Sequence, residues 1–210
     1  LKAEVTRKAE AAAGPGCILA TNTSTLPIGE LARATARPAD FIGIHFFSPV
    51  HRMMLVEIIK GAETGPRAVA KALDFVRQLK KTPIVVNDAR FFYANRCIIP
   101  YVNEGLIMVT EGVVPALIEN AAKQMGMPVG PLQLVDETSL ELGLSIQKAA
   151  AAADPDHRRT GADALLEEMV ERRGRLGRKS GAGMYDYDER GRRTGLWPGL
   201  SEIWPRAAAQ

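Results

Sequence analysis

The amino-acid sequence predicts an α/β domain followed by an all-α domain, and three observations predict it. Short apolar runs alternate with helical stretches as far as Asn87, strand-like runs stop there, and helical periodicity dominates the rest of the chain. Alternating strands and helices are typical of a mainly parallel sheet covered by helices. We therefore expect an α/β domain over residues 1–88 and a helical domain over residues 89–210.

The elements of the first domain follow in chain order. A helix over Lys2–Ala13 is expected to end at the Gly14-Pro15-Gly16 run, because glycine and proline break helical structure. After it we expect strands in CILATN (17–22), FIGIHFF (41–47), MMLVEII (53–59) and TPIVVN (82–87), with one helix ending at Ala34 and another over residues 67–81. Ser24 or Thr25 is the expected N-cap of the helix that ends at Ala34.

The second domain is expected to be helical throughout. The predicted helices cover residues 91–112, 114–126, 128–153 and 161–174, and Asp154-Pro155-Asp156 is a predicted loop. Pro100 lies inside the first of these runs and is expected to kink or break the helix, because proline lacks a backbone donor and clashes with the preceding turn. Pro115 suits the first turn of the next helix.

The composition is that of an ordinary globular protein and argues against several function classes. Basic residues gather at 172–179, but aromatic residues are few and no nucleic-acid-binding motif is present, so we expect no nucleic-acid partner. Cys17 and Cys97 lie far apart without a CxxC motif, so we expect no metal site, no disulfide and a reducing compartment. No membrane span is expected, because no apolar run approaches roughly 18 residues.

Two polar residues interrupt apolar strands: His45 ends FIGIH, and Glu57 stands inside MMLVEII. A lone histidine in such a run is usually a hydrogen-bonded core residue, and a lone glutamate usually marks a solvated position of an edge strand. Burying an unpaired polar or charged group is costly, so pairing of the two side chains explains both better. A carboxylate against one imidazole nitrogen fixes the tautomer and leaves the other nitrogen free as a general base.

Ser24 and Asn95 are the expected companions of this pair. They follow strand ends of the predicted sheet, where α/β proteins bind their ligands. Ser24 can bond a substrate hydroxyl or carbonyl, cap a helix, or do both. Asn95 can donate and accept at once, and its alternative is a hydrogen bond at the entry to a helix.

Five blocks of the sequence carry a resemblance that runs in one order from Lys2 to about Pro205. They are NTSTLPI, GIHFFSPVHRMMLVEII, VVND…FFYANR…PYVNEG, GMPVGPLQLVDE and GRLGRKSGAGMYDYD. In these blocks the chain resembles the 3-hydroxyacyl-CoA dehydrogenase family. It looks most like the dehydrogenase part of multifunctional fatty-acid β-oxidation proteins, in which the dehydrogenase follows an enoyl-CoA hydratase region.

The resemblance implies an enzyme that uses NAD to oxidise 3-hydroxyacyl-CoA to 3-ketoacyl-CoA. It implies that His45 is the catalytic base and that Glu57 orients it. It also implies that Asn95 and Ser24 lie at the reacting oxygen and the nicotinamide. The residues implied to contact the cofactor or lie beside it are Lys2, Asn22, Ser24, Ser48 and Lys179. The implied fold is the C-terminal half of a Rossmann-like NAD domain followed by a helical domain for dimerisation and substrate binding.

The sequence departs from the family pattern in two places. The family opens with a strand and a Gly-x-Gly-x-x-Gly turn that cradles the pyrophosphate, and this chain has neither. We therefore interpret the chain as part of a longer protein whose front half of the cofactor domain precedes Leu1. The family also has a glycine before the phenylalanine of its GF…NR motif, and here Arg90 precedes Phe91.

The resemblance further implies partners and a location. The expected partners are a 3-hydroxyacyl-CoA substrate and a second copy of the chain, with a thiolase subunit as a further candidate for the full-length protein. The expected location is the cytoplasm of a bacterium, with an organelle as the alternative.

Two other functions compete with this interpretation. The chain could be an inactive fragment that serves as a helical dimerisation or assembly module, and NAD binding by the 210-residue chain would distinguish this function from the enzyme. It could also be a different two-domain dehydrogenase that acts on a hydroxy acid. Many of those use a catalytic lysine, and no lysine stands among the strand-end residues here.

Overall fold

The computed structural model describes residues 2–153 and 156–205, and the chain divides into two compact units. The first unit is Leu1–Cys97 and the second is Ile98–Gln210. The last strand of the first unit ends at Asn87, and the division falls inside the helix that follows it.

The first unit contains a four-stranded sheet in the order β1-β2-β3-β4. Its strands are β1 (Leu19–Thr21), β2 (Phe41–Phe46), β3 (Leu55–Lys60) and β4 (Thr82–Asn87). The outer pairs, β1 with β2 and β3 with β4, are parallel, whereas the central pair β2–β3 is antiparallel. The sheet is therefore mixed, because the loop between β2 and β3 is too short for the crossover that parallel strands need.

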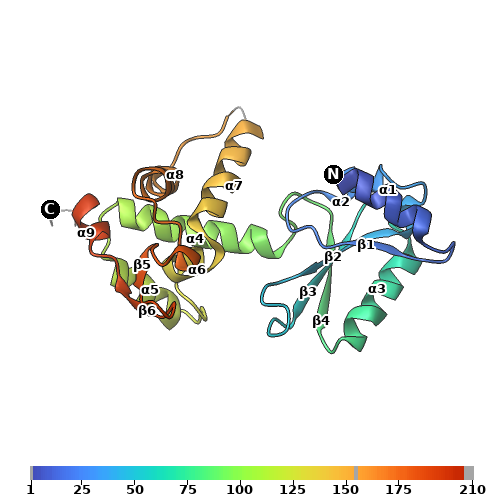
Figure 1. The fold of residues 1–210 in the computed structure, drawn as a ribbon, viewed down its shortest axis with the longest axis horizontal. Coiled ribbons are helices and arrows are strands. Elements are labelled where there is room, and N and C mark those ends of the chain that lie inside the picture. The colour runs from blue at the N-terminus through green and yellow to red at the C-terminus, as the bar shows by residue number, and fades with distance from the viewer. Residues whose placement is uncertain (1, 154–155, 206–210) are drawn as a thin grey trace. The chain divides into compact units, whose positions relative to one another are not determined.

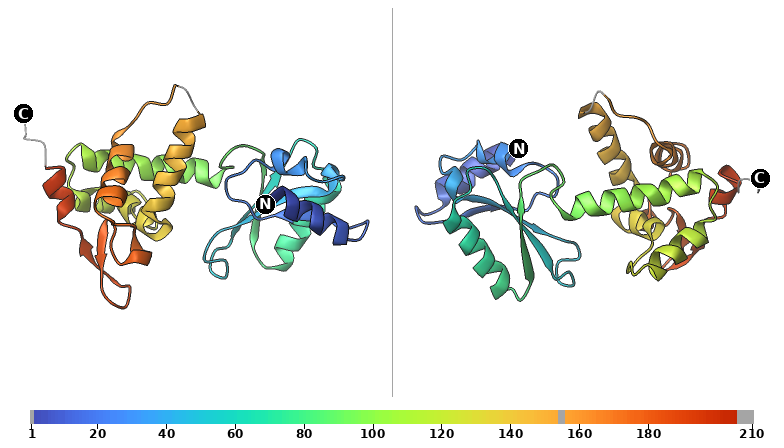
Figure 2. Two further views of the ribbon diagram at one scale, coloured as in Figure 1. Left: turned by 45° about the horizontal axis from the view of Figure 1, so that its top comes forward. Right: turned by 180° about the vertical axis from the view of Figure 1, so that it is seen from behind.

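Helices cover both faces of this sheet, as Figures 1 and 2 show from three directions. On one face, Ala68, Ala72 and Val76 of α3 (Pro66–Gln78) pack on apolar residues of β2 and β3. On the other face, α2 (Ile28–Ala32) packs on β2 and β3, and α1 (Lys2–Ala12) lies beside α2. Gly43 permits this close approach, because a Cβ there would lie 2.7 Å from the Cδ1 atom of Ile28.

Alternation along β2 and β3 decides what each face receives. Ile42, Ile44, Val56 and Ile58 join the core under α3. Phe41 and Ile59 join the core under α2, together with Phe92. Because side chains alternate along a strand, His45 and Glu57 share the face of Phe41 and Ile59. This is the face that α2 covers.

Several helix boundaries in the first unit differ from the predicted ones: α1 ends at Ala12 instead of Ala13, and α2 ends at Ala32 instead of Ala34. The expectation that Ser24 or Thr25 caps the second helix is wrong, since α2 begins at Ile28 after Pro27 and has no side-chain cap at its N-cap position. The carboxylate of Asp88 accepts the amide hydrogens of Ile28 and Gly29 instead, each at 2.8 Å.

The third helix, α3, ends at Gln78, three residues before the predicted end at Lys81. Lys80, with a φ of 57°, turns the chain away from the helix. A short 3₁₀ turn, η1 (Pro38–Asp40), precedes β2.

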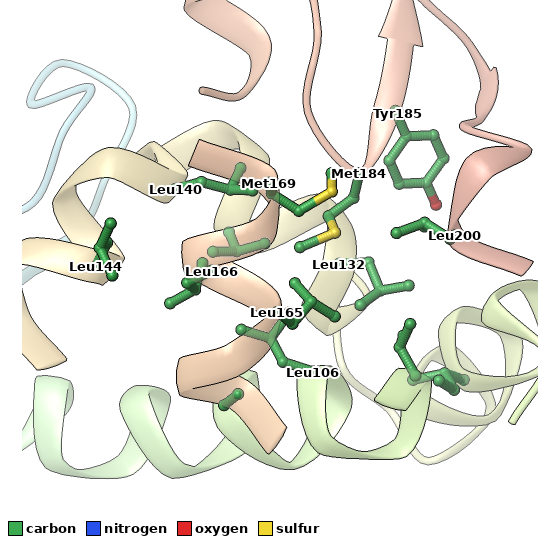
Figure 3. Packing of buried hydrophobic residues seen from close by; sticks show 14 residues of the cluster. Leu106, Leu132, Leu140, Leu144, Leu165, Leu166, Met169, Met184, Tyr185 and Leu200 are labelled. Carbon is green, nitrogen blue, oxygen red and sulfur yellow. The ribbon is translucent and has the colours of Figure 1, made fainter. Parts of the chain in front are cut away.

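The second unit is mainly helical. Its elements are α4 (Ala94–Thr110, whose first turn belongs to the first unit), α5 (Pro115–Gln124), α6 (Pro131–Thr138), α7 (Leu140–Ala153), α8 (Gly161–Glu167), η2 (Glu168–Arg172), η3 (Arg178–Ser180), β5 (Tyr185–Tyr187), β6 (Arg193–Leu196) and α9 (Gly199–Ile203). The helix α4 continues through Pro100 without a break. Leu106, Leu132, Leu165 and other buried side chains converge from α4, α6 and α8 in the core, as Figure 3 shows.

Three features of the second unit correct the sequence prediction. The unit is not all-α, because β5 and β6 pair as an antiparallel two-stranded sheet. The predicted helix over 128–153 is two helices, separated at Ser139, whose φ of 86° no α-helix allows. The predicted helix over 161–174 changes to a π-helical turn at Glu168. Residues 154 and 155 of the predicted loop lie outside the described residues.

Candidate active site

The pairing of His45 with Glu57 predicted from the sequence is present in the structure. Antiparallel pairing of β2 with β3 places the two residues directly opposite each other. The Nδ1 atom of His45 lies 2.7 Å from Oε2 of Glu57. His45 is 6% exposed and Glu57 is 0% exposed. The two costly burials are therefore explained by one contact between neighbouring strands.

The second oxygen of Glu57 is also occupied. Its Oε1 accepts the amide hydrogens of Tyr93 at 3.0 Å and Ala94 at 2.8 Å, at the start of α4. Burial alone would raise the pKa of Glu57, but the hydrogen bonds from His45 and from the two amides outweigh it and hold this pKa below its ordinary value. Glu57 is thus an ionised, fully bonded carboxylate inside the first unit.

An ionised Glu57 fixes the tautomer of neutral His45. A carboxylate only accepts hydrogen bonds, so Nδ1 of His45 is the donor and Nε2 carries the lone pair. The ring of His45 packs against Phe47, with 4.5 Å between centroids, and against Phe92 at 6.0 Å. The imidazole is therefore held on its flanks by aromatic rings and at one nitrogen by a carboxylate, as a positioned base requires.

The backbone before α4 is unusual at the residues that lead to the Glu57 amides. Phe91 has a φ of 67° and Phe92 a φ of 51°, in the left-handed region that favours glycine. In the family motif a glycine precedes the phenylalanine, and in this chain Arg90 stands at that position, before Phe91. The left-handed backbone, where a glycine would be free of strain, begins one residue later, at Phe91.

Asn95 lies in the first turn of α4 and reaches the loop after β1. Its Nδ2 donates a hydrogen bond of 2.9 Å to the backbone carbonyl of Ser24. Within residues 2–153 and 156–205, neither Oδ1 of Asn95 nor the Ser24 hydroxyl has a hydrogen-bond partner. Both groups are free to bond a ligand.

Asn22 and Lys2 line a cavity of about 430 Å³ beside β1, together with the apolar side chains of Leu19, Leu31 and Phe41 and the hydroxyl residues Thr6, Thr21 and Thr23. Asn22 also accepts the amide hydrogen of Phe46 through Oδ1, at 2.9 Å, next to His45 in the chain. One ammonium with several hydroxyl and amide groups suits the sugar and anionic parts of a dinucleotide. The volume suits a part of that ligand.

Ser48 and Lys179 complete the set of residues predicted at the cofactor. Ser48 is exposed in the loop after β2. Lys179 is exposed in η3 of the second unit. The cofactor roles of both residues stay predictions.

Three residues that shape the site have no role predicted from the sequence. Asp88 holds the start of α2. The buried Thr23 accepts the amide hydrogen of Leu26 at 3.2 Å, which turns the loop that carries Ser24. Lys81 donates to the carbonyls of Val50 and Met53 and so ties down the loop between β2 and β3. A carboxylate directly after the last strand was the available signal for Asp88; Lys81 has none in the sequence.

Residues 2–153 and 156–205 contain no group of three or more His, Cys, Asp or Glu side chains placed to hold a metal ion. No helix in the same ranges has the length and apolar character needed to cross a bilayer.

Comparisons with known proteins identify the family. Residues 1–89 match the family model of the 3-hydroxyacyl-CoA dehydrogenase NAD binding domain, and residues 92–187 match that of the 3-hydroxyacyl-CoA dehydrogenase C-terminal domain.

Solved structures with the same fold agree with these matches. (S)-3-hydroxybutyryl-CoA dehydrogenase PaaH1 from Ralstonia eutropha is 36% identical with a TM-score of 0.81, over 90% of this chain and 66% of that one. FadB2 from M. tuberculosis is 31% identical with a TM-score of 0.79, over 89% and 66%. The dehydrogenase part of multifunctional enzyme 1 from C. elegans is 25% identical with a TM-score of 0.66, over 100% and 47%. The chain thus spans 66% or less of the length of each of these structures. With both family domains matched in order, the chain belongs to the 3-hydroxyacyl-CoA dehydrogenase family.

Proposed function

We propose that this chain carries the catalytic base of an NAD-dependent dehydrogenase that oxidises 3-hydroxyacyl-CoA to 3-ketoacyl-CoA. The observation that carries the proposal is the 2.7 Å contact between Nδ1 of His45 and the ionised Glu57, which leaves Nε2 of His45 as the basic atom. Family membership supports the reaction class. One of the structural neighbours reported above, PaaH1, is described as an (S)-3-hydroxybutyryl-CoA dehydrogenase and supports the substrate class.

In the proposed reaction, His45 takes the proton of the substrate's C3 hydroxyl at Nε2. Glu57 stabilises the imidazolium that forms, because its negative charge lies against Nδ1. The second amide hydrogen on Nδ2 of Asn95 and the hydroxyl of Ser24 donate to the C3 oxygen and orient it as it becomes the ketone oxygen. In the reverse direction the imidazolium returns the proton to that oxygen. These groups position the substrate and transfer its proton, and the proton transfer typically raises the reaction rate by roughly 10²–10⁴-fold.

A bound NAD would supply the acceptor for the hydride of substrate C3. Lys2 and Asn22 would hold part of it, because both line the cavity beside β1. The Gly-x-Gly-x-x-Gly fingerprint does not occur in the sequence, so the present residues account for one side of the cofactor site.

The test uses the full-length protein that contains this chain. We expect His45→Gln to lower kcat about 10²- to 10⁴-fold with an unchanged circular dichroism spectrum, because the base is lost and the fold is kept. His51→Gln is the matched control, since His51 is exposed in the loop between β2 and β3. Near-normal turnover by the His45 variant would refute the proposal.

Assembly is a second candidate function, favoured by exposed apolar side chains around α5. Leu117 is 60% exposed, Met125 is 86% exposed and Val114 is 43% exposed. We propose that a second copy of the chain covers these side chains, because apolar side chains on a surface helix suit helix–helix contact. Leu117→Glu should then convert a dimer to a monomer in sedimentation experiments. A chain that dimerises but does not bind NAD in calorimetry would favour assembly over catalysis.

We propose fatty-acid β-oxidation as the pathway, since its intermediates are 3-hydroxyacyl thioesters. A thiolase subunit, which would cleave the 3-ketoacyl product, is the proposed partner of the full-length protein. The exposed free cysteines, Cys17 and Cys97, suit the reducing cytoplasm of a bacterium.

A further inference from the structure

We infer that the left-handed turn at Phe91 and Phe92, together with the first turn of α4, is a positioning device that holds Glu57 and Ser24 in place around His45. The inference rests on the proposed function for its catalytic meaning. Its geometry concerns groups within the first unit only. The positioning groups are two backbone amides and one side-chain amide, and none of them is a proposed acid or base.

Hydrogen bonds completely satisfy the buried charge of Glu57. Glu57 is 0% exposed, and both its oxygens accept hydrogen bonds, one from His45 and the other from the Tyr93 and Ala94 amides. A buried carboxylate without such partners would take up a proton or rotate towards water. The amides also stand at the N-terminus of a 17-residue helix, whose dipole favours a negative charge there.

The backbone that leads to these amides is strained. Two successive aromatic residues in the left-handed region cost roughly 1–2 kcal/mol each. Such a conformation persists only where the surroundings enforce it. Phe92 supplies the enforcement, because its side chain is 2% exposed and packs with Phe41 and Ile59 in the core under α2. The cost is therefore offset by burial of the ring that also flanks His45.

The same helical turn also contacts a second segment of the site. Asn95 follows Ala94 directly, and its Nδ2 holds the carbonyl of Ser24. One turn of α4 thus joins β3, which carries Glu57, to the loop after β1, which carries Ser24. A displacement of the start of α4 would move the partner of the base and the proposed substrate contact together.

The decisive variant is Ala94→Pro in this 210-residue chain. Ala94 is the first helical residue, where proline is tolerated, and the change removes one amide hydrogen from Glu57. We expect the carboxyl ¹³C titration of Glu57 to move to higher pH, because its charged form loses a donor. We also expect ¹⁵N shifts of neutral His45 to change from one tautomer to a mixture.

Ala94→Gly is the matched control, because it loosens the helix start but keeps the amide hydrogen. It should leave the Glu57 titration and the His45 tautomer as in the unaltered chain, even where it lowers the melting temperature. Among the described residues, the ionisable group that contacts Glu57 is His45, and aromatic rings flank the pair. A folded Ala94→Pro chain with both signals unchanged would overturn the inference.

A measurement on the unaltered chain covers the case in which the proline variant does not fold. The amide ¹H shifts of Tyr93 and Ala94 should titrate with the midpoint of the Glu57 carboxyl. Amide shifts that do not change at that midpoint would refute the inference. None of these signals depends on turnover, so they fail or succeed independently of the His45→Gln assay. In the full-length enzyme, Ala94→Pro should lower kcat about 10- to 100-fold with little change in KM.

Discussion

Each unit buries carboxylates, and their partners differ. In the first unit Glu57 contacts an imidazole, whereas in the second unit Glu119 (3% exposed) and Asp136 (1% exposed) accept hydrogen bonds from tyrosine hydroxyls. Glu119 also accepts the amide hydrogens of Leu132 and Gln133 at the start of α6. Backbone amides thus serve buried carboxylates in both units, and only the side-chain partner distinguishes them.

That partner decides what the carboxylate can do. Burial, followed by the hydrogen bond to Glu119, raises the pKa of Tyr185 far above its ordinary value, so this hydroxyl keeps its proton. An imidazole exchanges its proton near neutral pH. The second-unit carboxylates therefore stabilise the fold, and the first-unit carboxylate can also support proton transfer. Burial of a charge alone does not identify an active site.

The largest expected effect tests whether the buried carboxylates of the second unit stabilise its fold. Asp136→Ala leaves the amides of Met184 and Tyr185 and the hydroxyl of Tyr187 without their acceptor. We expect a loss of about 3–5 kcal/mol in the free energy of unfolding, because each buried group left unpaired is costly. Urea unfolding followed by tryptophan fluorescence measures it, since both tryptophans, Trp197 and Trp204, belong to the second unit.

The matched control for this variant is Asp136→Asn, which keeps one acceptor oxygen and nearly the same shape. It should lose clearly less stability than the alanine variant. A loss below about 1 kcal/mol in the alanine variant would mean that water replaces the carboxylate, and the contrast between the units would then weaken.

The next largest effect is that the contributions of Glu57 and Asp136 to stability change with pH in opposite directions. The pKa of Glu57 is lowered, so its contribution to stability is complete above its ordinary value of 4.5 and is lost as pH falls through the folded-state pKa. Burial, opposed by several hydrogen bonds, raises the pKa of Asp136. Its contribution is therefore complete below its ordinary value of 3.8 and is lost as pH rises through the folded-state pKa.

Two neutral variants separate these contributions. Between pH 7 and pH 3, the stability advantage of the unaltered chain over Glu57→Gln should shrink on acidification, and its advantage over Asp136→Asn should grow. Hydrogen-exchange protection of β2 and β3 reports the first unit, and tryptophan fluorescence reports the second. The same sign for both variants would contradict the comparison.

The smallest effect concerns the turn before α4. Phe91→Gly should change the free energy of unfolding by less than about 1 kcal/mol, because relief of left-handed strain offsets the lost ring contacts and the greater freedom of the unfolded chain. Phe91→Val should destabilise by about 1–2 kcal/mol, since β-branched residues fit this backbone poorly. Thermal unfolding of the two variants measures the difference. Equal stabilities would argue against strain at this turn.

Much of the first unit could be predicted because its signals are local. Apolar runs bounded by polar residues marked all four strands, and two polar residues in neighbouring strands indicated a cross-strand pair. The amides of Tyr93 and Ala94 could not be foreseen, since backbone groups carry no side-chain signal. Ser24 was mistaken for a helix cap because the actual acceptor is Asp88, 60 residues away from Ile28.

Some elements of the second unit could not be predicted either, because they carry no clear sequence pattern. The strands β5 and β6 are only three and four residues long and partly polar, so an apolar pattern did not mark them. The Asp188–Gly191 turn between them was the overlooked signal. Ser139 ends α6 with a left-handed backbone although neither glycine nor proline stands there.

The hydrogen bonds from Ile28 and Gly29 to Asp88 make the start of α2, next to the loop that carries Ser24, dependent on a residue that follows β4. The five-residue helix α2 has no side-chain cap of its own, so its first amides rely on a carboxylate that follows β4. If β4 slipped by one residue against β3, Asp88 would no longer accept those amide hydrogens. The loop carrying Ser24 would then lose the fixed helix start that follows it. Insertions or deletions near residue 88 would therefore displace Ser24, the proposed substrate contact, without altering Ser24 or His45 themselves.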